Sequence, residues 1–372
     1  MNRDLSAIKT IMVKVGSSSL CDEKGQINKE RILDLVQQIS KLRKQGYKMV
    51  LVSSGAVAAG AGLMGLESRP LAIPKKQALA AIGQGHLMQI YEEIFELFDL
   101  KVAQILLNHS DFDDRKRLLN LYNTINALTD YGAIPIINEN DALAVEEIKV
   151  GDNDTLAALL VPVVEADLVI LVSDIDGLYT KNPREYDDAI LLKYVEKVDD
   201  EIWNMAGASH SAFGTGGMQT KLNAAKIVNA YGSHMVIVNG EKENYLLNIF
   251  NEKEEGTWFK GDAQSMSART HWLAYRVNAR GKIIVDEGAG KALLDHHKSL
   301  LPGGIIGVEG QFLKDHVVTI ETKDQEIGRG IVNYSSDEIR QIMGKHSDQI
   351  EAILHYKGSD VVIHANNMIL KR

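Results

Sequence analysis

Cysteine is almost absent from this chain of 372 residues, which contains only Cys21. A single cysteine rules out a disulfide framework and is typical of a protein kept in a reducing compartment. No run of 18 apolar residues occurs, and the first residues do not form a secretory signal peptide. These absences favour a cytoplasmic protein that does not span a membrane.

Further absences exclude several classes of chemistry. No Ser/His/Asp or Cys/His arrangement predicts a catalytic nucleophile, and no spacing of Cys and His predicts a metal site. The 11 histidines are scattered along the chain, so we treat them as structural or surface residues. The net charge of −9 argues against a whole-chain affinity for nucleic acid or anionic membranes, although a local basic patch is still compatible with it.

What is present is a pattern of apolar strands alternating with amphipathic helices. Strands are expected at 10–15, 48–53, 102–107, 133–137, 168–173 and 234–238, and helices at 29–45, 74–98, 111–131 and 153–164. Near-continuous apolar strands separated by helices predict an α/β fold, with a mostly parallel open sheet covered by helices on both faces.

The pattern changes after about residue 255, where strands become short and are separated by glycines. This change predicts a second, small β-barrel-like domain. A capping-box pattern, Ser335 followed by Glu338, marks the start of one of its short helices. The expected division is an α/β domain at 1–258, a linker at 259–280, the small domain at 281–358 and a C-terminal tail at 359–372.

A glycine-rich segment, Gly214–Lys221, leads into a helical pattern. Its backbone N–H groups can approach an anion closely, and the N-terminal end of the helix adds positive potential. Lys221 lies in the first turn, where its ammonium group can reach a phosphate. The segment is neither a Walker A loop nor a dinucleotide fingerprint, because the defining residues of both are missing. It predicts a phosphate site, and a glycine-rich connection with an exposed lysine is the alternative.

A second lysine, Lys14, lies in the otherwise apolar strand 10–15, which ends in Gly16-Ser17-Ser18-Ser19. Burying a lysine is costly unless an anion meets it. At the carboxyl end of a strand, its side chain would face the crevice in which open α/β sheets bind ligands. Two lysines beside such turns suit a transferring phosphoryl group, whereas a lysine that extends from an edge strand to water is the alternative.

Polar clusters follow or precede other elements of the α/β part. They are Ser53-Ser54, Asn138-Glu139-Asn140-Asp141, Gly151-Asp152-Asn153-Asp154 and Ser173-Asp174. Each cluster alone is explained by the turn and N-cap preferences of Ser, Asn and Asp. Together at one edge of a parallel sheet, they predict a ligand site.

These motifs, in this order, resemble those of the glutamate 5-kinases, a branch of the amino acid kinase family. The resemblance runs the whole length of the chain and rests on residues 13–18, 53–56, 137–141, 148–154 and 214–221. Residues 284–289 and 300–304 resemble the PUA domain that many bacterial members carry. One departure is Ser173, where threonine is frequent in the family, but the hydroxyl group is kept.

The resemblance implies transfer of phosphate from ATP, with Mg²⁺ held mainly by the nucleotide, to the side-chain carboxylate of L-glutamate. The product would be L-glutamyl 5-phosphate, in the first step of proline biosynthesis. In this reading Lys14 and Lys221 stabilise the transferring group, and Asp154 orients both. The implied glutamate-binding residues are Ser54, Asp141 and Asn153. The implied ATP-binding residues are Lys14, Ser173, Asp174, Thr215, Gly216, Gly217, Met218, Gln219, Thr220 and Lys221.

The same resemblance implies inhibition by proline, a homo-oligomer and a hand-off of product to the next reductase of the pathway. Three alternatives remain open. A sibling kinase would act on aspartate, N-acetylglutamate, carbamate or UMP. A PUA-mediated RNA-binding factor is disfavoured because residues 281–358 contain few clustered Lys or Arg. A regulatory nucleotide-binding protein without turnover is disfavoured because Lys14, Asp154 and Lys221 are all present.

Overall fold

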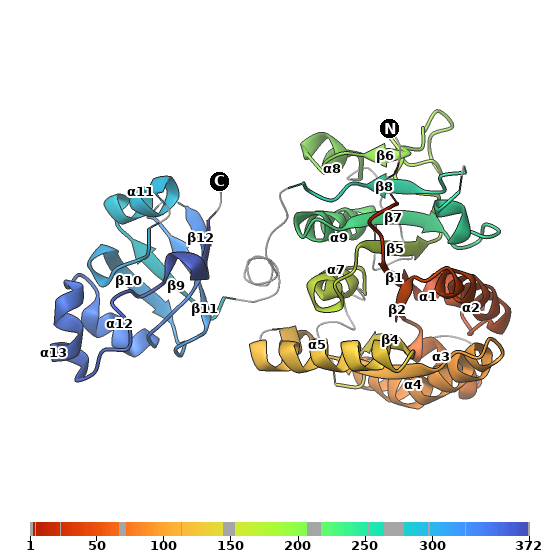
Figure 1. Ribbon diagram of the computed structural model, residues 1–372, viewed down its shortest axis with the longest axis horizontal. Coiled ribbons are helices and arrows are strands. Elements are labelled where there is room, and N and C mark those ends of the chain that lie inside the picture. The colour runs from red at the N-terminus through yellow and green to blue at the C-terminus, as the bar shows by residue number, and fades with distance from the viewer. Residues whose placement is uncertain are drawn as a thin grey trace. The chain divides into compact units, whose positions relative to one another are not determined.

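The computed structural model describes residues 3, 5–22, 24–66, 72–112, 114–143, 153–206, 217–251, 253–263, 279–296, 298–323 and 325–370. The chain folds into two compact units, Met1–Ser265 (unit 1) and Met266–Arg372 (unit 2). Figure 1 shows an open sheet with flanking helices in unit 1 and a smaller sheet in unit 2.

The centre of unit 1 is an eight-stranded sheet with the order β3-β4-β2-β1-β5-β7-β8-β6. Its strands are β1 (Thr10–Val15), β2 (Lys48–Val52), β3 (Val102–Leu107), β4 (Ile134–Glu139), β5 (Leu168–Ser173), β6 (Tyr194–Val195), β7 (His234–Asn239) and β8 (Thr257–Phe259). The pairs from β3 to β7 are all parallel. The prediction of a mostly parallel open sheet is therefore confirmed. Only β8 pairs antiparallel, with β7, and β6 extends the sheet beyond it.

Helices cover both faces of this sheet (Figure 1). On one face lie α1 (Ser17–Leu20), α2 (Lys29–Lys44), α3 (Ala56–Leu63) and α4 (Ile73–Glu96). On the other lie α5 (Arg115–Asp130), α7 (Asn153–Val164) and α9 (Met218–Ala230). The short helix α8 (Asp200–Ala206) packs on α9. Two 3₁₀ turns, η1 (His109–Phe112) and η2 (Leu247–Ile249), complete the described part of the unit.

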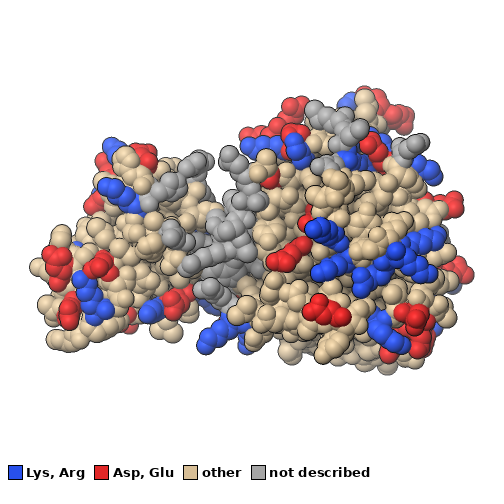
Figure 2. All heavy atoms as spheres, viewed as in Figure 1, with Lys and Arg blue, Asp and Glu red and all other residues tan. Residues whose placement is uncertain are grey.

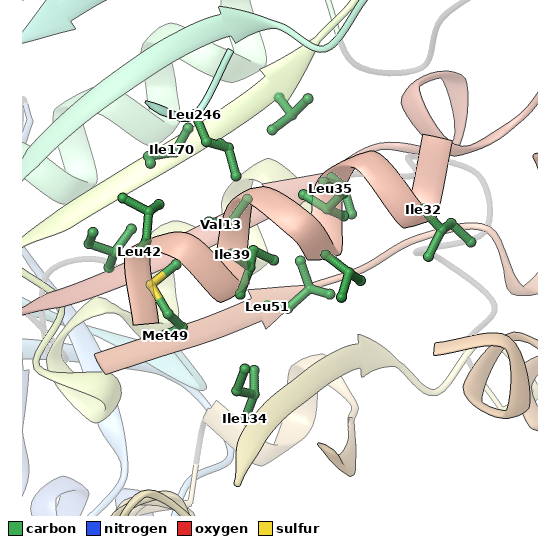
Figure 3. Close-up of a cluster of buried hydrophobic side chains, with 14 of the residues drawn as sticks. Val13, Ile32, Leu35, Ile39, Leu42, Met49, Leu51, Ile134, Ile170 and Leu246 are labelled. Atoms are coloured by element: carbon green, nitrogen blue, oxygen red, sulfur yellow. The ribbon is translucent and has the colours of Figure 1, made fainter. Parts of the chain in front are cut away.

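The main core of unit 1 lies between β1, β2, β5 and the apolar stripe of α2. Figure 3 shows Val13, Leu51 and Ile170, from three neighbouring strands, around Leu35 and Ile39 of α2. Each of these buried side chains contributes roughly 1.5–3 kcal/mol through removal from water. Because successive side chains of a strand point to opposite faces, the neighbours of Val13 along β1 face α7 instead.

Two local expectations for unit 1 are corrected, and one helix was not predicted. Strand β4 continues to Glu139, so Asn138 lies within the strand rather than after it. Helix α5 starts at Arg115, because Asp114 caps it by accepting from two backbone N–H groups of the first turn. Helix α3 was not expected, because its Ala- and Gly-rich sequence shows no amphipathic period.

Unit 2 has a five-stranded sheet with the order β10-β9-β11-β12-β13. Its strands are β9 (Gly281–Val285), β10 (Ile305–Gly310), β11 (Val317–Glu321), β12 (Glu326–Ile331) and β13 (Met368–Leu370). Its helices are α11 (Glu287–His296), α12 (Ser336–Ile342) and α13 (Ile350–Leu354), with 3₁₀ turns η3 (Pro302–Gly304), η4 (Ser347–Gln349) and η5 (Ala365–Asn367). The sheet and helices enclose a separate apolar core. The capping box of Ser335 and Glu338 is present at the start of α12.

Two of the expected domain limits need correction. The expected tail at 359–372 is wrong for its described part, residues 359–370, because β13 pairs with β12 and Val362 and Ile363 are fully buried. A segment this short shows no readable period in the sequence. A limit at residue 258 would cut β8, whose Trp258 is buried. Most of the expected linker, residues 264–278, lies outside the described residues.

Candidate functional site

Lys14 lies at the carboxyl end of β1, in the middle of the sheet. Strand β1 pairs with β2 on one side and β5 on the other, so the order of the strands along the chain reverses here. Ligands of open parallel sheets bind in the crevice at such a reversal, outside the carboxyl ends of the strands. The lysine side chain is buried on the face that α7 covers.

Asp154, in the first turn of α7, contacts two lysines at once. Its Oδ1 lies 2.5 Å from Nζ of Lys14, and its Oδ2 lies 2.9 Å from Nζ of Lys221 in the first turn of α9. All three side chains are buried. Two ammonium groups and one carboxylate leave a buried excess of one positive charge. Because unbalanced buried charge is costly, the cluster favours an incoming anion.

The charge state of Asp154 follows from these contacts. Burial alone would raise the pKa of its carboxyl group. The ammonium groups of Lys14 and Lys221 outweigh burial and hold the pKa of Asp154 well below its usual range. Asp154 therefore remains ionised throughout the neutral range and keeps both lysines in place.

Ser54 and Asn153 form a polar pair next to this cluster. Nδ2 of Asn153 donates to the carbonyl oxygen of Ser53 at 2.8 Å and to Oγ of Ser54 at 2.6 Å. A carbonyl oxygen can only accept, which fixes the orientation of the amide. The hydroxyl proton of Ser54 is then available to a ligand. Gly55, at φ +105°, makes the turn that places Ser54 at the end of β2, and glycine adopts this conformation readily.

Asp141 lies two residues beyond β4 and lines a cavity of about 260 Å³. The cavity lies between β3 and β4 and the helices α3 and α4. Its lining residues are Ala56, Ala80, Ala81, Gln84, Gly85, Gln104, Leu106, Glu139, Asn140, Asp141 and Ala142. A space of this size holds several water molecules and suits a small metabolite rather than a nucleotide.

The residues expected to bind the nucleotide are only partly described. Ser173, buried at the end of β5, donates to Asp174 at 3.2 Å, and Arg184 donates to the same carboxylate at 3.0 Å. Burial of Asp174 opposes ionisation, but a backbone hydrogen bond and Arg184 lower its pKa. Thr215 and Gly216 lie outside the described residues.

Gly217 is the N-cap of α9, and Met218, Gln219 and Thr220 form the first turn with Lys221. The hydroxyl of Thr220 donates to the carbonyl oxygen of Gly217 at 2.8 Å. This turn brings Lys221 to Asp154.

Sequence reasoning missed a buried hydrogen-bond chain behind the acceptor residues. Ser53 Oγ lies 2.8 Å from the hydroxyl of Tyr91, and Asn138 Oδ1 accepts from Asn153 at 3.3 Å. Asn138 in turn donates to Gln84 of α4 at 2.8 Å. The sequence signal was Gln84 itself, a polar residue one turn from Ala80 and Leu87 on the buried stripe of α4.

In the described part of the chain, no group of three or more His, Cys, Asp or Glu side chains could hold a metal ion. None of the helices described is both long and apolar enough to cross a membrane.

A known family profile matches each of the two units. The profile of the Amino acid kinase family matches residues 9–239, and the profile of the PUA domain matches residues 281–354. A solved structure of carbamate kinase from Giardia lamblia, bound to AMP-PNP, superposes with a TM-score of 0.50 at 19% identity, covering 69% of this chain and 100% of that one. This similarity supports the fold alone.

Curated relatives match over nearly the whole chain. Glutamate 5-kinase from Caldanaerobacter subterraneus is 48% identical over 361 residues, covering 97% of both chains. Glutamate 5-kinase from a Thermoanaerobacter species is 46% identical with the same coverage. Glutamate 5-kinase from Geobacter sulfurreducens is 46% identical over 368 residues, covering 98% of both. With a lysine–aspartate–lysine cluster at the strand reversal and a PUA domain that follows in the sequence, the chain belongs to the amino acid kinase family, in its glutamate 5-kinase branch.

Proposed function

We propose that this protein transfers the γ-phosphoryl group of ATP to the side-chain carboxylate of L-glutamate, the first step of proline biosynthesis. The observation that carries the proposal is the contact of Asp154 with both Lys14 and Lys221, at the point where the strand order reverses. Relatives that share nearly the full length and almost half the residues are glutamate 5-kinases.

In the reaction, a carboxylate oxygen of glutamate attacks the γ-phosphorus, and the bond between this phosphorus and the bridging oxygen breaks. ADP leaves with the electron pair, and the product is an acyl phosphate. No general base is needed, because the side-chain carboxylate is already ionised near pH 7. The difficulty is the approach of two anions, so catalysis rests on positioning and electrostatic stabilisation.

The lysines supply that stabilisation in the proposal. Lys14 comes from a strand and Lys221 from the start of a helix, so their ammonium groups reach the phosphoryl group from two different elements. Asp154 holds both at distances of 2.5 and 2.9 Å, so little reorganisation is needed during transfer. Backbone N–H groups at the start of α9 would hold the phosphates.

Mg²⁺ would arrive with the nucleotide in this scheme. The only carboxylate within the described lysine cluster, Asp154, is engaged by two ammonium groups, which leaves no protein cage for the ion there. When bound together with the nucleotide, Mg²⁺ would supply positive charge that neutralises part of the charge of the phosphates. The side chains of Ser173 and Asp174, at the end of the neighbouring strand β5, would contact the nucleotide.

The acceptor would lie between Ser54 and Asp141. The hydroxyl of Ser54, oriented by Asn153, would donate to a carboxylate. Asp141, on the wall of the neighbouring cavity, would accept from the α-ammonium group. Proline shares the α-ammonium and α-carboxylate groups, so inhibition by proline is expected to compete with glutamate.

An assay with several acceptors tests the proposal. ATP turnover with L-glutamate, with the acyl phosphate trapped by hydroxylamine, should exceed turnover with aspartate, N-acetylglutamate, carbamate or UMP. Preference for one of these others would assign a sibling activity, and absence of turnover with all of them would leave a nucleotide-binding protein.

RNA binding by unit 2 is the less favoured second function. Several of its basic side chains are paired with acids, including Lys282 with Glu321 at 2.9 Å and Arg340 with Asp337 at 2.8 Å. Figure 2 shows a band of Lys and Arg across the visible face of unit 1, whereas the visible face of unit 2 mixes both signs. A gel shift with RNA at low and physiological salt tests this function.

A further inference from the structure

The amide of Asn138 has only one possible orientation. One of its side-chain atoms accepts from the backbone N–H of Glu139 at 2.9 Å. A backbone N–H only donates, so this atom is Oδ1, and the same oxygen accepts from Asn153 at 3.3 Å. The NH₂ group of Asn138 must therefore be the atom that lies 2.8 Å from Gln84.

This orientation fixes Gln84 in turn. A donor faces it from Asn138, so Gln84 presents its Oε1 to that donor. The NH₂ group of Gln84 is directed away from Asn138. Gln84 also lines the cavity of about 260 Å³ described above. Its NH₂ group is the hydrogen-bond donor of this side chain that Asn138 does not engage.

The charges around the cavity match one end of an amino acid. The acidic residues Glu139 and Asp141 line the cavity together with Gln84 of α4. Carboxylates suit an ammonium group, whereas an NH₂ group that cannot turn suits a carboxylate. The α-ammonium and α-carboxylate groups of an amino acid are separated by a single carbon atom and need such a pair of partners.

We propose that Gln84 is a specificity-determining residue that donates a hydrogen bond to the α-carboxylate of the amino acid in this cavity. Asn138 holds the amide of Gln84 in the donating orientation, and Asn153 ties Asn138 to the site of phosphoryl transfer. The inference rests on the proposed function. It adds to the acceptor site a residue that recognises the α-carboxylate group by donating a hydrogen bond.

The substitution Gln84→Glu tests the inference. A glutamate at this position still accepts from Asn138 with one oxygen, while the other oxygen replaces the NH₂ group and faces the cavity. We expect KM for L-glutamate to rise about tenfold or more, because a donor becomes a charged acceptor, with KM for ATP unchanged. Inhibition by proline should weaken in parallel.

A change of substrate makes the test specific. Isoglutamine keeps the side-chain carboxylate and the α-ammonium group but carries an amide in place of the α-carboxylate. Gln84→Glu should prefer isoglutamine to glutamate, whereas the wild-type enzyme should show the opposite preference. Gln89→Glu, the same change on an exposed residue of α4, should behave as the wild type toward both acceptors.

The possible outcomes separate a failure of the inference from a failure of the proposed function. If Gln84 only supports Asn138, then Gln84→Glu will keep the wild-type KM and the wild-type preference, and the inference is overturned. An equal loss of both acceptors, with an unchanged melting temperature, also overturns it. If the wild-type enzyme does not phosphorylate glutamate at all, the proposed function fails, and this result is visible before any variant is measured.

Discussion

At the scale of single residues, the site depends on one carboxylate shared by two lysines. The sequence predicted that Lys14 and Lys221 would serve a phosphoryl group, but either lysine could also have reached water. The structure buries both and joins them through Asp154. A buried lysine without a counter-charge is costly. Because one carboxylate balances only one of the two buried ammonium groups, only an incoming anion offsets the cost of burial fully.

Replacing either lysine should remove most of the activity. Lys221→Ala or Lys14→Ala is expected to lower kcat by orders of magnitude, because removal of one preorganised electrostatic partner typically costs about 3–4 kcal/mol. Steady-state kinetics with saturating ATP and glutamate measure the effect. A near-normal kcat in either variant would remove that lysine from the proposed mechanism.

Replacing Asp154 should lower the free energy of unfolding as well as the activity. Asp154→Asn leaves two buried ammonium groups without a counter-charge, and we expect a loss of about 3–5 kcal/mol in the free energy of unfolding at pH 7. Urea unfolding of the wild type and the variant measures this loss.

The pH dependence of this loss has a definite sign. The pKa of Asp154 is lowered in the folded state, so the unfolded state binds more protons in acid. Its contribution is therefore complete above the ordinary aspartate pKa of about 3.9 and declines as the pH falls below that value. The difference between wild type and variant should shrink from pH 7 to pH 3. A constant difference would show that charge is not its origin.

Replacing Asp141 should weaken the binding of glutamate and leave the binding of ATP almost unchanged. Asp141→Ala is expected to raise KM for glutamate far more than KM for ATP, because its proposed partner is the α-ammonium group. Initial rates with each substrate varied in turn measure both constants. Equal changes in the two would place Asp141 outside the acceptor site.

At the scale of secondary-structure elements, the acceptor side of the site depends on how closely α3 and α4 pack. A Cβ atom on Gly83 of α4 would lie 2.0 Å from the carbonyl oxygen of Ala56 and 2.2 Å from the backbone N of Gly60. Both contacts are with the backbone of α3, which cannot rotate away. Helix α3 begins directly after Ser54 and Gly55, so the packing distance sets the position of the acceptor residues.

Two glycines of α4 should therefore respond in opposite directions. Gly83→Ala is expected to destabilise unit 1 by about 1–3 kcal/mol through overpacking, and to raise KM for glutamate. Gly85→Ala, two residues further on, meets no atom within 4 Å and should stabilise the helix by about 0.5–1 kcal/mol. Thermal melts of the two variants measure these changes. Destabilisation of the same size in both would indicate that helix contact is not the cause.

At the scale of the whole molecule, every proposed catalytic and substrate residue lies in unit 1. The two units have separate sheets and separate apolar cores. Unit 1 is completed by β8, near which Arg3 donates to the carbonyl oxygens of Glu254, Glu255 and Gly256. A truncated kinase must keep this strand, so a cut at residue 258 is too early.

A chain that ends at Ser265 should fold and phosphorylate glutamate. It retains the complete eight-stranded sheet, and unit 2 would then serve regulation, assembly or a further partner. A cooperative melt of the purified fragment and its glutamate-dependent release of ADP measure the two properties. A folded but inactive fragment would refute the separation of roles.

The sequence by itself determined most of the secondary-structure elements and the set of residues that make up the proposed site. Period and turn residues located β1, α2 and α7 to within a residue or two, because long apolar stripes and caps are local signals. The motif series also indicated the family. Local signals were too weak for α3, β8 and β13, which are short or lack a period, and their places depend on partners distant in the sequence.

Only the tertiary structure decided which of these residues meet. The contact of Asp154 with Lys14 joins residues 140 positions apart, because parallel strands bring their carboxyl ends to one edge. The chain from Asn153 through Asn138 to Gln84 likewise crosses from α7 through β4 to α4. A glutamine on an apolar helical stripe signals a polar contact in the sequence, but the sequence does not identify its partner. The structure identifies Asn138 as that partner, and the backbone N–H of Glu139 fixes the orientation of the Asn138 amide.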